Sequence, residues 1–170
     1  MRSVRAIAAL LASALLLAGC SLTPVYSGGR SSAAAEMISA TEIPLIEGDA
    51  GFLVRQALLQ RFAASEGANA GGGGRYRLNV RLDDNITGFG VRGDDAITRE
   101  SRTLRARWQL VDTTNEVTLI DATERSDAGI DVVSSEYAVV AAESDALDRL
   151  AEDIATRITA RIASYASGQR

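Results

Sequence analysis

The sequence predicts a single α+β domain in which two helices pack on one face of a four-stranded, mostly antiparallel sheet. Apolar and polar residues alternate through residues 75–82 and again through 103–111, and this period of two is typical of half-buried antiparallel strands. Apolar residues recur every three or four positions through 50–65 and 144–165, which is the helical period. In chain order, the expected elements are a strand, a helix, three strands and a helix.

The N-terminus has the pattern of a lipoprotein signal peptide over residues 1–19. Arg2 and Arg5 precede an apolar run of about 12 residues, which is shorter than the roughly 20 that a membrane-spanning helix needs. The run ends in Leu17-Ala18-Gly19-Cys20, which matches a bacterial lipobox, and Cys20 is the only cysteine in the chain. We therefore expect cleavage before Cys20 and lipidation of its thiol, which would anchor the chain to a membrane. An ordinary signal peptide with an incidental cysteine is the alternative.

The residues that follow Cys20 predict how the mature chain is organised. Ser21 is not the aspartate that retains lipoproteins in the inner membrane of enteric bacteria, so the periplasmic side of the outer membrane is favoured. Residues 20–36 are expected to form a lipidated N-terminus and a flexible tether, because 27–35 is rich in serine, glycine and alanine. Residues 37–166 would then form the single domain and residues 167–170 a C-terminal tail.

The first strand and the first helix are adjacent in the sequence. Residues 37–46 have the apolar content of a strand, and Pro44 places it at a sheet edge, because proline cannot donate a ladder hydrogen bond. Asp49 is a candidate cap for the helix over 50–65.

Three consecutive strands are expected in the middle of the chain. Residues 75–82 and 103–111 supply the first two, 117–123 supply the third, and 127–133 are expected to remain extended. Glycines and an acidic pair mark the tip of a long hairpin between the first two strands: Gly88, Gly90, Gly93, Asp94 and Asp95.

The last element is expected to be a long helix that begins near Ser144, its candidate cap. Its apolar positions form one stripe, composed of Leu147, Leu150, Ala151, Ile154, Ile158, Ile162 and Tyr165. Asp145 with Arg149, and Asp153 with Arg157, are pairs four residues apart on its outer face. We interpret the stripe as core rather than as a cofactor site.

The composition removes most catalytic chemistries. All 18 basic residues are arginine, so the chain has no imidazole base, no Schiff-base lysine and no P-loop lysine. The single cysteine excludes an internal disulfide and a cysteine metal cluster. The pairs Asp83-Asp84 and Asp94-Asp95 are interpreted as turn residues. We expect a protein that is not an enzyme and that binds no cofactor or metal.

Arginines are expected to line the sheet face opposite the apolar one. They are Arg75, Arg77, Arg81, Arg105 and Arg107, with Arg92 and Arg99 near the hairpin tip. The simpler interpretation is that this is the solvated face of an antiparallel sheet. The alternative is an anion-binding site, because a guanidinium binds phosphate through two parallel hydrogen bonds. Nucleic acid is not an expected partner, since the net charge is −4.

Four features occur together in this sequence. They are Leu17-Ala18-Gly19-Cys20, Thr23-Pro24-Val25-Tyr26, the strand-helix opening, and the run Ala128-Gly129-Ile130-Asp131-Val132-Val133-Ser134-Ser135-Glu136-Tyr137. In this combination the chain resembles the lipopolysaccharide-assembly lipoprotein family, most closely its alphaproteobacterial members. The resemblance implies a non-enzymatic plug and assembly partner of the outer-membrane β-barrel that inserts lipopolysaccharide, in contact with lipopolysaccharide itself. It also implies that Arg92 contacts this ligand, with Arg99 as a second candidate.

A second hypothesis is an auxiliary lipoprotein of a phospholipid transporter of the ABC type in the inner membrane. Proteins of that class have a similar lipid anchor and a small α+β domain. An enzyme such as a carboxylate-based glycan hydrolase is disfavoured, because the sequence offers no convincing pair of catalytic carboxylates.

Overall fold

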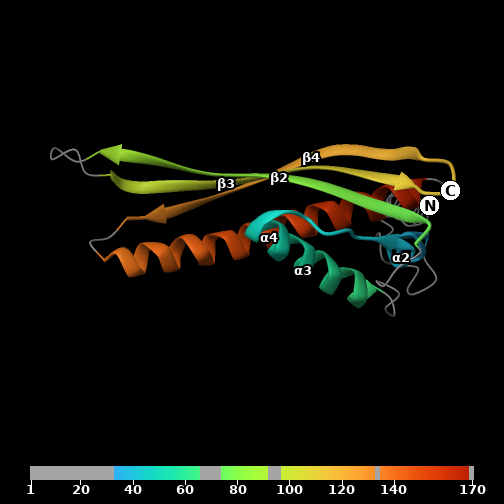
Figure 1. Cartoon of the computed structure of the whole chain (residues 1–170), viewed down its shortest axis with the longest axis horizontal. Helices are drawn as coiled ribbons and strands as arrows, with labels where there is room; N and C mark the ends of the chain where they lie inside the picture. Colours follow the sequence, from blue (N-terminus) through green and yellow to red (C-terminus); the bar gives the residue numbers. More distant parts are fainter. Residues whose placement is uncertain (1–32, 66–73, 92–96, 133–134, 169–170) are drawn as a thin grey trace, which may run out of the picture.

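The computed structural model describes residues 33–65, 74–91, 97–132 and 135–168. These residues form three helices on one face of a four-stranded sheet (Figure 1). The predicted α+β class is confirmed, with the helices on one face of a mostly antiparallel sheet and one more helix at the start. None of the described helices is both long enough and apolar enough to cross a lipid bilayer.

Three long strands form an antiparallel meander. They are β2 (Tyr76–Val91), β3 (Ile97–Asp112) and β4 (Val117–Asp131), which pair in sequence order. The register between β2 and β3 is continuous from Tyr76 opposite Asp112 to Val91 opposite Ile97. Because side chains alternate between the two faces of a sheet, even-numbered residues from Leu78 along β2 face the helices and odd-numbered residues face away.

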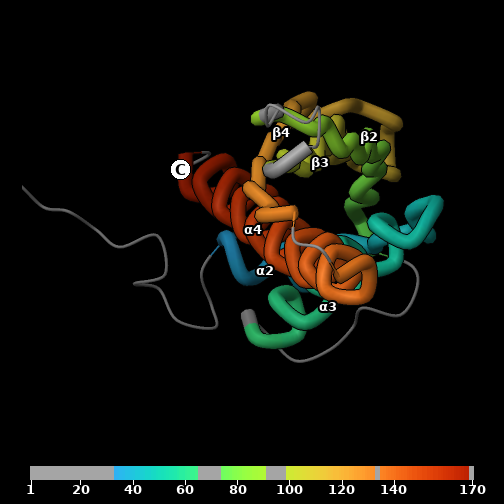
Figure 2. The backbone as a smooth tube through the Cα atoms, turned by 90° about the vertical axis from the view of Figure 1, so that its left-hand side faces the viewer, coloured from blue at the N-terminus to red at the C-terminus, as the bar shows by residue number. Residues whose placement is uncertain are grey.

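The hydrophobic core lies between the sheet and the helices. α4 (Glu136–Gly168) contacts β3 and β4 on one side, and α2 (Ala33–Ser39) and α3 (Gly48–Ser65) on the other (Figure 2). The largest fully buried side chains come from every layer and include Trp108, Leu58, Leu104, Leu110, Ile154 and Ile158. The apolar stripe that predicted the last helix is therefore core, as expected, except for Tyr165, which is half-buried.

The first predicted strand, over residues 37–46, is mostly wrong. α2 occupies its first part, and only two residues, β1 (Thr41–Glu42), pair with the sheet. This short strand runs parallel to β2 at the sheet edge. Pro44 ends it soon afterwards, because proline has no N–H for a further ladder bond.

The predicted boundary between tether and domain, after residue 36, is too late. α2 begins at Ala33, and Ala34 and Ala35 are buried. Alanine has the highest helix propensity, so an alanine-rich segment becomes helical when α4 offers it a surface to pack on. Residues 1–32, which include the predicted signal peptide and Cys20, lie outside the described residues.

Both long helices begin earlier than predicted. α3 begins at Gly48, so Asp49 lies in its first turn rather than capping it. α4 begins at Glu136, and Ser144 lies within the helix instead of at its start.

The central hairpin is also longer than predicted. Gly88 and Gly90 belong to β2, whose pairing with β3 continues past them. Asp83 and Asp84 lie in the middle of β2, so the interpretation of this pair as turn residues is wrong. Gly93, Asp94 and Asp95 lie outside the described residues.

Gly51 allows the first turn of α3 to pack against the chain that precedes it. A Cβ atom at Gly51 would lie 2.5 Å from the carbonyl oxygen of Ile46, closer than such contacts occur. We expect Gly51→Ala to lower the free energy of unfolding by about 2 kcal/mol, because backbone must move to relieve the overlap. The matched control is Gly129→Ala in β4, where a Cβ would meet nothing within 4 Å. Urea denaturation measures both, and equal effects would contradict the expectation.

Candidate functional site

Four arginines gather at the centre of the sheet face that points away from the helices. Arg81 of β2 lies directly opposite Arg107 of β3, and the neighbouring Arg105 lies directly opposite Arg125 of β4. We call Arg81, Arg105, Arg107 and Arg125 the arginine cluster. The predicted face is thus confirmed for Arg81, Arg105 and Arg107, whose neighbours Leu104, Ala106 and Trp108 are buried on the other face.

Only half of the arginine cluster is engaged in ion pairs within the described part of the chain. Arg107 Nη2 lies 3.5 Å from Asp121 Oδ2, and Arg125 Nη2 lies 2.8 Å from Asp127 Oδ1. Arg81 and Arg105 make no ion pair with any described residue, and both are exposed.

Carboxylates lie among these arginines and moderate their charge. Asp83 of β2 is directly opposite Arg105, and Asp121 and Asp127 lie on the same face of β4. Hydrogen bonds from Arg125 and then from Thr103 hold the pKa of Asp127 below its usual range. The predicted cationic stripe is therefore a face with both arginines and aspartates. Among the described residues, only Arg81 and Arg105 of the arginine cluster have no ion pair and could bind an anion.

The facing arginines make this surface suitable for an anion. Like charges directly opposite one another destabilise a pair of strands, and both Arg81–Arg107 and Arg105–Arg125 are such pairs. A phosphate or carboxylate held between two guanidiniums would relieve this repulsion and accept charge-assisted hydrogen bonds. Within the described ranges, no three acidic or cysteine side chains form a group that could hold a metal ion.

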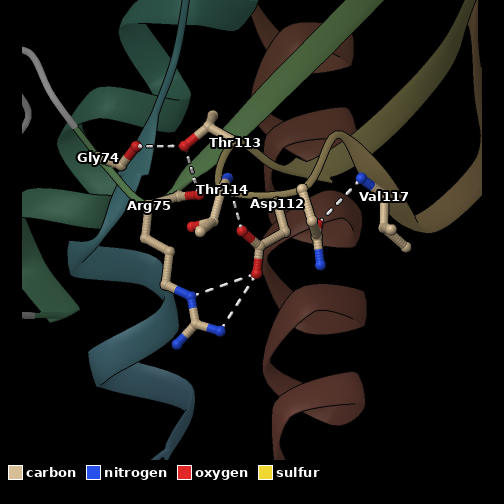
Figure 3. Close-up of polar contacts among 7 residues, drawn as sticks. Gly74, Arg75, Asp112, Thr113, Thr114 and Val117 are labelled. Carbon is tan, nitrogen blue, oxygen red and sulfur yellow. Dashed lines mark hydrogen bonds and ion pairs between the residues drawn. The ribbon is translucent and has the colours of Figure 1, made fainter.

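Arg75 serves the turn at one end of the sheet (Figure 3). Its Nε and Nη2 atoms each lie 3.2 Å from Asp112 Oδ2, and its guanidinium carbon lies 5.2 Å from the centre of the Tyr76 ring. The backbone N–H of Thr114 donates to Asp112 Oδ1 at 2.9 Å, and this bond is the main cause of the lowered pKa of Asp112. Arg75, one of the predicted site residues, thus pairs with Asp112 at this turn.

Two other predicted arginines, Arg77 and Arg99, lie away from the cluster. Arg77 is half-buried opposite Val111. Arg99 lies toward the hairpin end, where its Nε atom is 2.9 Å from Asp131 Oδ1 in an exposed ion pair. Arg92, the position favoured by the resemblance, lies outside the described residues.

Two arginines of this sheet were not predicted from the sequence. Arg125 joins the cluster only because β4 pairs with β3 in the observed register. Arg102 lies on the helix-facing side, where Nε and Nη2 bind both carboxylate oxygens of Asp84 at 2.9 and 2.6 Å. Because side chains alternate between the two faces of a strand and Leu104 is buried, the sequence could have placed Arg102 on the buried face. No pattern in the neighbouring sequence indicates that Asp84 is its partner.

Polar contacts also join α4 to the inner face of β4. Arg161 Nε lies 2.7 Å from Glu124 Oε1, a carboxylate that is almost completely buried. Ser126 Oγ donates to Asp153 Oδ2 at 2.6 Å, and this hydrogen bond is the main cause of the lowered pKa of Asp153. These contacts fix α4 on the inner face of the sheet, and no described helix covers the outer face.

Comparison with known proteins identifies the family of this fold. A sequence profile of the LptE family, described as Lipopolysaccharide-assembly, matches residues 38–162. The chain belongs to this family. A comparison with curated protein sequences finds no match. LptE-family proteins are non-enzymatic lipoproteins of the outer membrane.

Solved structures of bacterial lipoproteins share the LptE-family fold. A protein from Caulobacter crescentus CB15, described as a lipoprotein, is 26% identical, with a TM-score of 0.62 over 82% of this chain and 98% of that one. A minor lipoprotein from Acinetobacter baumannii is 16% identical, with a TM-score of 0.56 over 73% and 91%. Lipoprotein B from Nitrosomonas europaea is 14% identical, with a TM-score of 0.59 over 81% and 90%. At these lower identities the last two show the fold alone.

Proposed function

We propose that this LptE-family chain is an outer-membrane lipoprotein, anchored through Cys20, that acts as plug and assembly partner of the β-barrel that inserts lipopolysaccharide. The family match over residues 38–162 carries the proposal. The outer face of the sheet supports it, because arginine, aspartate, asparagine and glutamine side chains suit the polar lumen of a barrel. The chain's own contribution would be to bind and orient, with no catalytic step.

The arginine cluster is the proposed contact for lipopolysaccharide. The phosphates of lipid A are anions, and Arg81 and Arg105 are exposed guanidiniums without an ion-pair partner among the described residues. Arg99, toward the hairpin end, and Arg92, which lies outside the described residues, remain proposed contacts by family resemblance.

Affinity capture tests the partner. The tagged, lipidated protein would be extracted from gently solubilised membranes, and we expect a large outer-membrane barrel to copurify at near-equal stoichiometry. Depletion of the protein should then make lipopolysaccharide accumulate inward of the outer leaflet. Copurification with an inner-membrane phospholipid transporter, together with unchanged surface lipopolysaccharide after depletion, would overturn the proposal in favour of the auxiliary transport role.

Reversing the charge of Arg105 should weaken binding of purified lipopolysaccharide. We expect Arg105→Glu to lower the affinity about tenfold, since a charge-assisted hydrogen bond is replaced by repulsion. Arg149→Glu is the control, because it makes the same charge change at an exposed position of α4. Titration of immobilised protein with lipopolysaccharide, and with lipid A lacking its phosphates, measures the effect. If Arg105→Glu and Arg149→Glu bind lipopolysaccharide with equal affinity, the proposal that the arginine cluster contacts lipopolysaccharide is wrong.

A further inference from the structure

One edge of the sheet is open along most of its length. β1 pairs only with Tyr76 and Arg77, so among the described residues β2 has no strand from Asn79 to Phe89 on the side away from β3. An open strand edge presents unpaired N–H and C=O groups that can bind another strand. The opening therefore offers a surface for strand addition.

The chain after β1 is held away from this edge by α3. Arg55 Nε of α3 donates to the carbonyl oxygens of Ile43 and Pro44, each at 3.2 Å. Gly51 brings the first turn of α3 against the carbonyl oxygen of Ile46. These contacts explain why the segment does not continue along β2.

A groove of about 740 Å³ separates this segment from β2. Pro44, Leu45 and Ile46 line one side, and Val80, Arg81 and Arg107 are among the residues on the other. Leu45 is 87% exposed, although it is a large apolar residue. The segment side of the groove is thus mainly apolar with one acidic residue, Glu47, and the sheet side carries the two cations.

The backbone of β2 points its free hydrogen-bonding groups into this opening. Tyr76 donates its N–H to Ala40, on the β1 side, whereas the carbonyl of Arg75 accepts from Thr113, on the β3 side. Backbone groups alternate between the two neighbours of an antiparallel strand, and the register with β3 is unbroken. The N–H and C=O groups of Val80 and Leu82, which lie beyond the pairing with β1, therefore face the open edge.

The side chains beside the edge define what would bind there. Val80 and Leu82 are half-buried apolar residues on the helix side, and Arg81 is exposed on the other side. A strand added to β2 would place alternate side chains beside these two environments. Its sequence should therefore alternate apolar residues with acidic ones.

The opposite edge of the sheet is less suited to strand addition. β4 has an irregular register with β3 at Leu110 and Val111, and bulges hinder the pairing of an edge. Its accessible faces also carry several acidic residues: Asp121, Asp127 and Asp131.

We propose that the β2 edge binds an extended segment of a partner protein, in which apolar and acidic residues alternate, as an added strand. The apolar side chains lie along Val80, Leu82 and Leu45, and the acidic side chains lie near Arg81 and Arg107. A second copy of this chain fits less well, because its β2 edge would add its own Arg77 and Arg81. The inference does not depend on which membrane complex contains the protein.

A synthetic strand tests the proposal. The probe is a labelled peptide about eight residues long, a usual strand length, in which valine and glutamate alternate. It would be titrated against the full-length chain in mild detergent, with fluorescence anisotropy as the measurement. We expect saturable binding and a change in the emission of Trp108, the only tryptophan, which lines the groove. The same peptide with lysine in place of glutamate should bind at least about tenfold more weakly.

Variants locate the binding site. Arg81→Glu should weaken peptide binding about tenfold, whereas Arg149→Glu, with the same charge change on α4, should not. Arg105→Glu, which is outside the groove lining, should reduce lipopolysaccharide binding but not peptide binding, so the two proposals can fail separately.

Amide exchange gives a second measurement that needs no variant. On peptide binding, exchange should slow at Val80 and Leu82, whose N–H groups face the edge, and stay unchanged at Asn79 and Arg81, which already pair with β3. Absence of peptide binding, binding that is insensitive to Arg81→Glu, or unaltered exchange at Val80 and Leu82 would each overturn the proposal. So would self-association of the chain through β2 that the peptide does not disrupt.

Discussion

Replacing Trp108 with alanine is expected to lower the free energy of unfolding by about 3–5 kcal/mol. Trp108 is 1% exposed and belongs to the core between β3 and the helices. Its removal would leave a cavity bounded by neighbours on several elements, and a strand paired on both sides cannot collapse to fill it. Urea denaturation of the full-length protein, followed by circular dichroism, measures the change.

The next residue along β3 provides the control for Trp108→Ala. Gln109 lies on the opposite face, where its amide donates to Asp121 Oδ2 at 2.8 Å in an exposed contact. Gln109→Ala is expected to change the free energy of unfolding by less than about 1 kcal/mol. A loss at Gln109 as large as that at Trp108 would contradict the assignment of the two sheet faces.

The faces of β2 and β3 could be predicted because each strand is buried on one side only. Leu104, Ala106 and Trp108 alternate with Arg105 and Arg107, and this local pattern alone decides which residues face the helices. The arginines predicted on the outer face therefore lie there in the structure. Their grouping into a cluster depends on strand register, which brings together residues far apart in the sequence.

The first two turns of α4, before Ser144, could not be predicted from periodicity. Tyr137 is 92% exposed and Val140 is 63% exposed, so apolar residues lie on the outer side of this part of the helix. Without a buried stripe there is no helical pattern to detect, and the prediction began only near Ser144, where burial begins. Gly88 and Gly90 of β2 gave a false signal, because glycines are typical of turns. In the structure, pairing between β2 and β3 continues past them.

The ion pair between Arg102 and Asp84 illustrates an interaction that the sequence hides. From the sequence, Asp84 is predicted to lie in a turn and Arg102 just outside the strand predicted over residues 103–111. In the structure both lie on the helix-facing side of the sheet, with side chains only 13% and 25% exposed. Arg102 Nη1 also donates to the carbonyl oxygen of Glu143 at 2.8 Å, which connects the hairpin to α4.

Replacing Arg102 with alanine is expected to cost about 3 kcal/mol of unfolding free energy. The change leaves the Asp84 carboxylate, whose side chain is 25% exposed, without its cation, and this partial exposure puts the cost at the lower end for a buried pair. Hydrogen bonds with Asp84 raise the pKa of Arg102, in keeping with a charge that the fold stabilises. Amide exchange should also accelerate in α4 around Glu143.

A double-mutant cycle separates the ion pair from the packing of the arginine stem. Replacing both partners with apolar residues, Arg102→Met with Asp84→Leu, should recover most of the loss, because no unpaired charge remains. Arg99→Ala is the matched control on the same strand: its ion pair with Asp131 is equally short at 2.9 Å but exposed, so the expected cost is below about 1 kcal/mol. If the losses in unfolding free energy of the two single variants simply add up in the double variant, the ion pair contributes no coupling energy. The contact of Arg102 with Glu143 would then be what holds the hairpin to α4.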